Sequence, residues 1–332
     1  MRCMTKDGVV LGVLRGSAVH VPPFHLAREA DLSPTAVDAC ILHLREAGFE
    51  IELRPGFGYK LLECPDRLIP DDLWARLKLA EDSQATLGFV REIISLERTE
   101  STNDVAAQLG RDGAAGGVVV LAEQQTAGRG RFGRKWESPA GQGIWMSLLL
   151  RPTLPLTDWA RLTTWAAVAV ARAIETVARC SARIKWPNDI EVCGRKIAGL
   201  LAEIGVDRDG REFAVLGIGI DVNQKLAEFP PELRDRAISL REATGRTIDR
   251  AELAAVLLRE LAETEGKLPR HFEELVSEAA RRSTVPGHAI EARIGETVLS
   301  CVAEELDDDG HLLLRTAHGI SKLSAGEVSL RV

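Results

Sequence analysis

The sequence "ARIKWPNDIEVCGRKIAGLLAEIGVDRDGREFAVLGIGIDVN", residues 182–223, contains three successive strand patterns. They are "ARIKWPNDIEV", "KIAGLLAEIGV" and "EFAVLGIGIDVN", and only the turn sequences "CGRK" and "DRDG" separate them. Connections this short join antiparallel neighbours, because a parallel pair needs a crossover of about a dozen residues or more. The stretch therefore predicts antiparallel pairing and an α+β fold rather than a doubly wound one.

The segments on either side extend the same domain. Two more buried-strand patterns and two helix patterns occupy residues 116–125, 143–152, 158–180 and 250–268. The last of these is amphipathic, with Leu253, Val256, Leu257 and Leu261 on one face. We therefore expect a mixed or antiparallel central sheet with helices over residues 66–282, entered through a linker with the sequence "ECPDRLIPDD".

A smaller unit is predicted over residues 1–65. It contains two helical patterns, the first with Leu26, Ala27 and Ala30 on one face. Ser33 can cap the second, in which Val37, Ile41, Leu42 and Leu44 are near helical spacing. The alternating sequence "FEIELRPGFGYKLL" then predicts a hairpin that turns at Pro55-Gly56. Two helices followed by a hairpin are typical of a winged helix-turn-helix.

A second small unit is predicted over residues 283–332. It has five short strand patterns, "AIEARI", "TVLSCVAEEL", "HLLLRTA", "GISKLS" and "VSLRV", with "DDDG" as the clearest turn. Strands this short at close spacing favour a small β-barrel.

Composition excludes several classes of protein. The chain has 332 residues, 45% of them hydrophobic, and a formal net charge of −7, which argues against general coating of nucleic acid. The longest apolar stretch, "TTWAAVAVA", is shorter than the roughly 20 residues of a membrane span. The six cysteines, Cys3, Cys40, Cys64, Cys180, Cys193 and Cys301, form no C-x-x-C pair. We therefore expect a soluble cytoplasmic protein with reduced thiols and no structural metal.

The most basic segment is "QQTAGRGRFGRKW", residues 124–136, which has no acidic residue. Arg129, Arg131, Arg134 and Lys135 are therefore not neutralised by their sequence neighbours. The intervening glycines let backbone N–H groups approach an anion closely, and arginine suits carboxylate and phosphate oxygens. The alternative is a solvated loop whose charges only aid solubility.

Other stretches also combine polar groups with unusual positions. Lys185 ends a strand pattern and precedes Trp186-Pro187, so it either faces an anion or extends its amine to water. Gly199, and the pair Gly217 and Gly219, interrupt apolar strands, which is typical of close approach by a ligand or of a bulge. Gly217 and Gly219 lie on one strand face and predict a flat slot. Ser101, Thr102 and Asn103, which precede a helical pattern, predict either an N-cap or contacts to a polar ring.

Together these stretches resemble a known family. "ESTND", "EQQTAGRGRFGRKW", "KWPND", "GRKIAGLLAE" and "GIGIDVNQ" are similar, in order and spacing, to the signatures of biotin–protein ligases. The three-unit layout resembles the bifunctional bacterial form, in which the ligase is also the biotin operon repressor. The resemblance implies a catalytic domain like that of class II aminoacyl-tRNA synthetases and a C-terminal SH3-like barrel.

The resemblance also implies an activity. Such enzymes use biotin and ATP, with Mg²⁺, to form biotinyl-5′-AMP. They then transfer biotin to one lysine of a biotin carboxyl carrier protein. We also expect this protein to have no membrane partner and, by the same resemblance, to form a homodimer. Two alternative hypotheses for the function are a biotin-sensing DNA-binding repressor with weak ligation and a lipoate-type protein ligase.

The family's site residues carry over by position. Lys185 and Arg131 are the implied catalytic residues. The implied biotin-binding residues are Ser101, Thr102, Asn103, Gln125, Gly128, Arg129, Gly130, Arg131, Lys185 and Gly199. The implied adenylate or ATP contacts are Arg131, Arg134, Trp136, Asn188, Asp189 and Asn223.

Two residues depart from the family pattern. Phe132 stands where arginine is common, and Asp221 stands where asparagine is more frequent. A carboxylate at position 221 would repel phosphates unless it binds Mg²⁺ or points away. The implied DNA-binding segment lies between Phe24 and His43, but its second helix has no Arg, Lys, Asn or Gln at its front. Operator binding and a purely structural role therefore both remain open for this unit.

Overall fold

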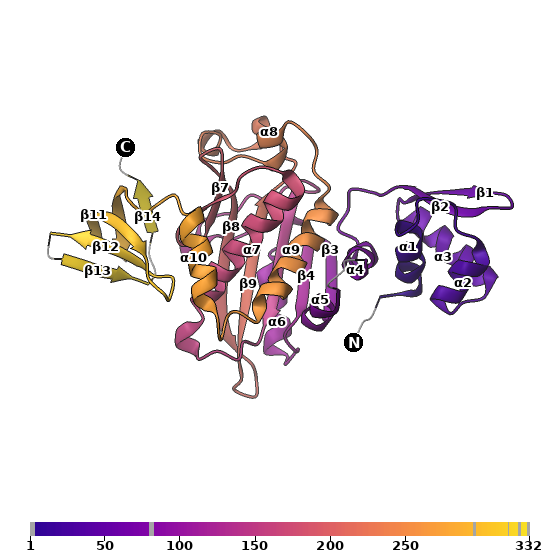
Figure 1. Ribbon diagram of the computed structural model, residues 1–332, viewed down its shortest axis with the longest axis horizontal. Coiled ribbons are helices and arrows are strands. Elements are labelled where there is room, and N and C mark those ends of the chain that lie inside the picture. Colours follow the sequence, from indigo (N-terminus) through magenta and orange to yellow (C-terminus); the bar gives the residue numbers. More distant parts are fainter. Residues whose placement is uncertain (1–3, 80–82, 295–296, 318, 325–326, 331–332) are drawn as a thin grey trace.

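The computed structural model describes residues 4–79, 83–294, 297–317, 319–324 and 327–330. A helical N-terminal unit and a β-rich C-terminal unit lie at opposite ends of a central domain built on one sheet (Figure 1). Among the described residues, no helix combines the length and the apolar character that a bilayer span requires.

The central sheet has seven strands in the order β3-β4-β5-β9-β8-β7-β6. Their bounds are β3 Glu92–Thr99, β4 Val118–Gln125, β5 Gly143–Leu150, β6 Arg183–Lys185, β7 Asp189–Val192, β8 Arg195–Val206 and β9 Glu212–Asp221. Strands β3 and β4 are parallel, and every other neighbouring pair is antiparallel. The predicted antiparallel pairing of the stretch 182–223 is therefore confirmed, within a mixed sheet.

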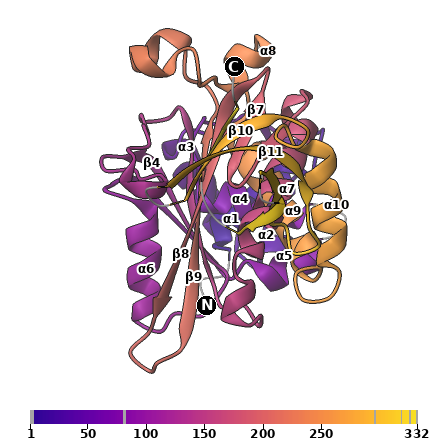
Figure 2. The same cartoon turned by 90° about the vertical axis from the view of Figure 1, so that its left-hand side faces the viewer.

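Helices cover both faces of this sheet. Helix α6 (Thr102–Arg111) lies on one face, and α7 (Arg161–Ala178), α9 (Arg250–Glu265) and α10 (Phe272–Arg282) lie on the other (Figure 2). Successive side chains of β9 point to opposite faces of the sheet, which fits helices on both faces. Phe213 and Val215 pack with Ala106 of α6, whereas Leu216, Ile218 and Ile220 join the larger core beneath α7 and α9. One strand thus serves two cores because its side chains alternate.

Shorter helices lie in the connections. They are α4 (Pro70–Lys78), α5 (Ser83–Phe89), α8 (Leu240–Thr244) and the 3₁₀ turns Arg131–Gly133, Leu156–Asp158, Leu226–Glu228 and Pro231–Leu233.

The N-terminal unit contains one helix more than the sequence predicts. The predicted elements are α2 (Pro23–Ala30), α3 (Pro34–Glu46) and the hairpin of β1 (Glu50–Arg54) and β2 (Gly58–Glu63), and α1 (Lys6–Arg15) precedes them. Val10, Leu11 and Leu14 of α1 are buried, but the run "VVLGVL" carries no polar positions to mark a helical period. Of the apolar residues near helical spacing in α3, Val37, Ile41 and Leu44 are buried, whereas Leu42 is 55% exposed.

The expected linker into the central domain is partly wrong. Helix α4 begins at Pro70, within that sequence, and contributes to two cores. Ala75 packs in the N-terminal core, whereas Leu73 and Leu77 pack in the central one. A helix shared by two cores therefore joins the two units, where the sequence suggested a linker.

The C-terminal unit is a five-stranded antiparallel sheet in the order β13-β12-β11-β10-β14. Its strands are β10 Ala289–Ile294, β11 Thr297–Leu306, β12 Leu312–Thr316, β13 Gly319–Leu323 and β14 Glu327–Leu330. They match the five predicted patterns, although the last two residues of the chain lie outside the described residues. Five cysteines are free thiols, as predicted, and Cys3 lies outside the described residues.

A buried arginine fixes the chain that enters the central domain. Arg250, which is 0% exposed, donates to the carboxylates of Asp66 and Glu123, each at 2.8 Å. Glu123 also accepts the backbone N–H of Leu68 at 2.8 Å. One guanidinium thus links the segment before α4, the end of β4 and the start of α9.

We predict that Arg250→Ala lowers the free energy of unfolding by about 3–5 kcal/mol, because it leaves the buried Glu123 carboxylate without its cationic partner. Chemical denaturation of the full chain measures this loss. Arg259→Ala on the same helix is the control, since Arg259 lies 3.6 Å from the half-exposed Glu252 and its loss costs about 1 kcal/mol or less. Similar losses in the two variants would contradict the prediction.

Candidate ligand-binding site on the α6 face of the central sheet

Four residues from four neighbouring strands form one row across the sheet. Lys185 is opposite Asp189, Asp189 is opposite Gly199, and Gly199 is opposite Gly219. Directly opposed residues of antiparallel strands share a face. This is the α6 face, because a Cβ at Gly217, two residues from Gly219, would meet Asn103 of α6 at 2.4 Å. The row therefore places the lysine on the same sheet face as two positions that have no side chain.

The indole of Trp136 lies over the two glycines. A Cβ at Gly199 would lie 2.9 Å from its ring, and one at Gly219 would lie 2.6 Å from it. Of the slot predicted over Gly217 and Gly219, only the Gly219 part receives this ring, together with Gly199 of the neighbouring strand, whereas Gly217 faces Asn103. The ring's Nε1 is buried without a hydrogen-bond partner among the described residues. An unpaired buried donor is rare in proteins and can serve an acceptor on a ligand.

A buried polar cluster joins α6 to the sheet. The hydroxyl of Ser147 lies 2.7 Å from the hydroxyl oxygen of Thr102 and 2.5 Å from the amide oxygen of Asn103. The side-chain oxygen of Gln125 accepts the Thr102 N–H at 2.8 Å, and Asn103 donates to Glu203 at 2.6 Å. These groups converge from α6, β4, β5 and β8, so a polar ring bound here would find donors and acceptors already in place.

Ser101 is the N-cap residue of α6, but its side chain makes no capping hydrogen bond. It is only 3% exposed. The N-cap interpretation therefore does not account for the serine hydroxyl.

The basic loop is fastened to α6 by an ion pair. Both oxygens of Asp104 accept from Arg129, at 2.6 and 2.7 Å. These hydrogen bonds lower the pKa of Asp104 and raise that of Arg129. Gly128 is needed for close packing, because a Cβ there would lie 2.6 Å from the carbonyl oxygen of Trp136.

The tip of the loop reaches the "KWPND" turn. Arg131 donates to the amide oxygen of Asn188 at 3.0 Å, and the Asn188 amide nitrogen donates to the carbonyl of Leu200 at 2.9 Å. Phe132 is 67% exposed with a φ of +58°, and the Arg131 guanidinium lies 4.9 Å from its ring centroid. Phe132 thus occupies the outside of the tip, and the arginine bends back toward the sheet.

Two ammonium groups lie on this side of the sheet. The Lys185 amine is 3.6 Å from a Glu191 oxygen, and the Lys196 amine is 2.6 Å from an Asp189 oxygen. Lys196 also lies 5.2 Å from the Trp136 ring centroid. The site therefore combines an aromatic ring, several cations and a polar cluster, which suits a ligand with a polar ring at one end and an anionic group at the other.

Asn223 has a different environment from the one expected. Its amide nitrogen donates to the carbonyl of Ile248 at 2.9 Å, and its amide oxygen accepts the Ile248 N–H at 3.0 Å. It is 4% exposed. This amide fastens the end of β9 to the segment before α9, and both of its polar atoms are bonded there rather than offered to an adenylate.

Asp221, the second departure from the family pattern, is 6% exposed and accepts from the side chain of Gln224 at 2.7 Å. Burial raises the pKa of Asp221 to about 7, against the opposing effects of the Gln224 hydrogen bond and the charge of Lys196. Near neutral pH a substantial fraction of this carboxyl is therefore uncharged, which reduces the repulsion of phosphates that the sequence suggested.

Several residues of the site were not predicted from the sequence. They are Asp104, Ser138, Ser147, Lys196 and Glu203. Ser147 was detectable as the single polar residue in the apolar run "GIWMSLLL". The others are ordinary polar residues in sequence, and only the register of the sheet and the path of the loop bring them to the site.

Two cavities lie away from this site. One, of about 620 Å³, lies between α1, the start of α2 and α4, and is lined by Val9, Val13 and Leu79 among others. The other, of about 700 Å³, lies near the end of α7 and is lined by Arg179, Arg246 and Arg259 among others. The slot over the paired glycines is filled by Trp136 rather than open.

Comparisons with known proteins agree with the sequence motifs. Residues 95–223 match the model of the biotin/lipoate A/B protein ligase family, and residues 287–331 match that of the biotin protein ligase C terminal domain. The bifunctional ligase/repressor BirA of Bacillus spizizenii is 38% identical over 90% of this chain and 90% of its own. The biotin–[acetyl-CoA-carboxylase] ligase of Mycobacterium tuberculosis is 33% identical over 72% of this chain and 88% of its own.

A solved structure has the same central architecture. The biotin protein ligase of Aquifex aeolicus, in complex with biotin and ATP, superposes with a TM-score of 0.62 at 31% identity. The match covers 73% of this chain and 99% of that chain.

We predict that Asp221→Asn removes a pH dependence of stability. Between the ordinary pKa of 3.8 and about 7, the folded chain retains a proton that the unfolded chain has released, so stability falls as pH rises through this range. Each pKa unit corresponds to about 1.36 kcal/mol, so the variant should gain about 2–3 kcal/mol relative to the unaltered chain between pH 5 and pH 8. Urea denaturation at both pH values measures this difference. An advantage that does not grow with pH would contradict the prediction.

Proposed function

The chain belongs to the biotin/lipoate A/B protein ligase family, and on this basis we propose that it is a biotin–protein ligase. It forms biotinyl-5′-AMP from biotin and ATP and transfers biotin to a lysine of a biotin carboxyl carrier protein. Two observations together support this proposal. Arg131 of the basic loop contacts Asn188, and Lys185 lies in one row across the sheet with Asp189, Gly199 and Gly219. The contact and the row bring the basic loop and a lysine to one face of the sheet.

We assign the biotin end of the ligand to the buried polar cluster. Ser101, Thr102, Asn103 and Gln125 supply hydroxyl and amide groups at the start of α6, where a ureido ring needs both donors and acceptors. We assign Gly128, Arg129 and Gly130 to cover this end from the loop, and Gly199 to leave room for the Trp136 indole that packs on the sheet beside it. The carboxylate of biotin then points along the sheet toward Lys185.

In the first step, a carboxylate oxygen of biotin attacks the α-phosphorus of ATP, and the bond to pyrophosphate breaks. Negative charge concentrates at that phosphorus, and fixed cations stabilise it. We assign this role to Lys185 and Arg131. The adenylate is surrounded by Arg134, Trp136, Asn188 and Asp189. Mg²⁺ enters together with ATP, since carboxylate and phosphate oxygens are suitable ligands for this ion.

In the second step, the amine of the carrier lysine attacks the acyl carbon of the mixed anhydride, and AMP leaves. No nucleophile of the ligase is needed. The contacts of Arg129 with Asp104 and of Arg131 with Asn188 hold the loop over the site. A closed loop excludes water, which would otherwise hydrolyse the anhydride.

The match to the biotin protein ligase C terminal domain favours biotin over lipoate as the substrate. We further propose that the enzyme is cytoplasmic and forms a homodimer. Strand β3, at the end of the central sheet, offers an edge for pairing.

A second candidate function is operator binding by a winged helix-turn-helix made of α2, α3 and the β1–β2 hairpin. One observation favours it: Asp38, which the sequence places in the implied recognition helix, accepts a hydrogen bond from the hydroxyl of Tyr59 at 2.7 Å. Its carboxylate is thus held toward the hairpin. A gel shift with DNA upstream of biotin genes, with and without biotin and ATP, tests this function independently of ligation.

The ligase proposal predicts that the full chain, incubated with biotin, ATP, Mg²⁺ and a carrier domain, adds one biotinyl group to the carrier. Intact-protein mass spectrometry measures the product, and lipoate in place of biotin tests the alternative substrate. A folded chain that leaves the carrier unmodified would rule out the proposal.

Within that assay, we predict that Lys185→Ala lowers kcat/KM for carrier biotinylation by about 10²–10³, the usual cost of removing one charge-stabilising group from an active site. The matched control is Lys267→Ala, because Lys267 pairs with Glu274 beyond α9, on the opposite side of the sheet. The control should remain within about twofold of the unaltered enzyme. Equal activity of Lys185→Ala and the control would remove Lys185 from the mechanism.

A further inference from the structure

Trp186 is a residue of the central domain whose side chain lies in the core of the C-terminal unit. It follows Lys185 at the end of β6 and is 6% exposed. Its neighbours in that core include Ile290, Leu312 and Leu323, all from the C-terminal sheet. The residue adjacent to the proposed catalytic lysine is therefore held by a different structural unit.

The indole also makes a specific polar contact. Its Nε1 donates to the carbonyl of Gly310 at 3.0 Å, in a buried setting. Gly310 has a φ of +78°, and a Cβ there would lie 3.1 Å from Thr164 Oγ1 of α7. The acceptor therefore lies on a turn that fits closely against the central domain.

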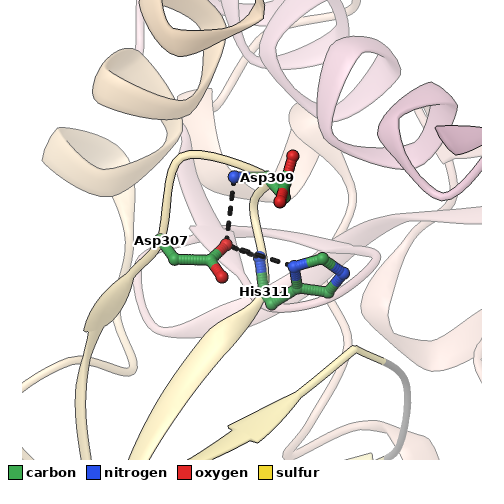
Figure 3. A group of neighbouring side chains, drawn as sticks. All are labelled: Asp307, Asp309 and His311. Atoms are coloured by element: carbon green, nitrogen blue, oxygen red, sulfur yellow. Dashed lines mark hydrogen bonds and ion pairs between the residues drawn. The ribbon is translucent and has the colours of Figure 1, made fainter.

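That turn, residues 307–311, is internally fixed. An Asp307 oxygen accepts the backbone N–H groups of Asp309 and His311, at 3.0 and 2.9 Å, and lies 3.2 Å from the His311 ring nitrogen (Figure 3). Lys322 lies 2.6 Å from the other Asp307 oxygen. Asp307, Asp309 and His311 have the residue types of metal ligands. These contacts account for their grouping as a closed turn, and we assign no metal to it.

Two more contacts fasten the C-terminal unit on either side of Trp186. Arg161 of α7 pairs with Asp309 of the turn at 2.9 Å. The N–H of Thr284, just before the C-terminal sheet, donates to the carbonyl of Ile184 at 3.0 Å. The main chain at Ile184 and the side chain of Trp186 are thus both held, with Lys185 between them.

Lysine has a long, flexible side chain, so the position of its ammonium depends on where the main chain is held. Lys185 ends a strand of three residues at the edge of the sheet, which gives it few ladder contacts of its own. We infer that Trp186 and the turn 307–311 are positioning elements for Lys185, so that docking of the C-terminal unit sets the rate of adenylate formation. This inference rests on the proposed ligase function.

Trp186→Phe tests the inference, because it keeps an aromatic ring in the C-terminal core but removes the N–H donor together with part of the ring volume, a loss that the control below matches. We expect the rate of biotin-dependent pyrophosphate release to fall about tenfold, since small displacements of a catalytic group have effects of this size or larger. The rate should change more than the KM for biotin, because the polar cluster that we assign to the biotin ring is intact.

Trp165→Phe is the matched control. Trp165 is buried too, and its Nε1 likewise donates to one acceptor, Thr264 Oγ1, at 2.9 Å. Its side chain, however, packs between α7 and α9, away from the C-terminal unit. This variant should lose similar stability and retain pyrophosphate release within about twofold. In a Lys185→Ala background, Trp186→Phe should add less than about twofold, because two residues that act through one interaction are not additive.

Gly310→Ala approaches the same contact from the C-terminal unit, and we expect it to slow pyrophosphate release as Trp186→Phe does. Full activity of a folded Trp186→Phe, or an equal loss in Trp165→Phe, would overturn the inference. So would an undiminished effect of Trp186→Phe in the Lys185→Ala background. If the unaltered chain releases no pyrophosphate with biotin and ATP, the ligase proposal itself fails. If the unaltered chain is active and only the variants behave otherwise than expected, the inference about Trp186 fails and the ligase proposal stands.

Discussion

The site depends on three positions of the central sheet that have no side chain. Gly217 leaves room for the amide of Asn103, and Gly199 and Gly219 leave room for the indole of Trp136. Any Cβ at these positions would come within 3 Å of those groups. Glycine weakens a strand, so these residues are tolerable only because two well-packed cores surround them. The strands are less stable for lacking these side chains. Their absence lets the loop that carries Trp136 and the helix that carries Asn103 pack directly on the sheet.

The electrostatic character of the site is local. The chain as a whole carries a net charge of −7, yet Arg129, Arg131, Lys185 and Lys196 converge on one face of one sheet. Each has an internal partner, Asp104, Asn188, Glu191 or Asp189. These partners hold the cations in position before an anionic ligand arrives, and such preorganisation is what makes fixed charges effective in catalysis.

The three units are joined by buried contacts of large side chains rather than by flexible linkers. Arg250 fastens the segment before α4 to the central sheet, and Trp186 fastens the "KWPND" turn to the C-terminal unit. Both residues belong to the central domain and satisfy polar groups that would otherwise be buried without partners. The end units are thereby coupled to elements that border the site.

The sequence by itself determined the antiparallel pairing of residues 182–223 and the strand patterns of both end units. It also identified the basic loop and Lys185, because short turns, alternation and uncompensated charge are properties of neighbouring residues. Tertiary structure alone decided the roles of Ser147, Lys196, Asp104 and Asn223. It also decided that α4 is a helix shared by two cores and that Trp186 packs in the C-terminal unit. These roles depend on which residues from distant segments the register and helix packing bring together, and spacing along one chain carries no such information.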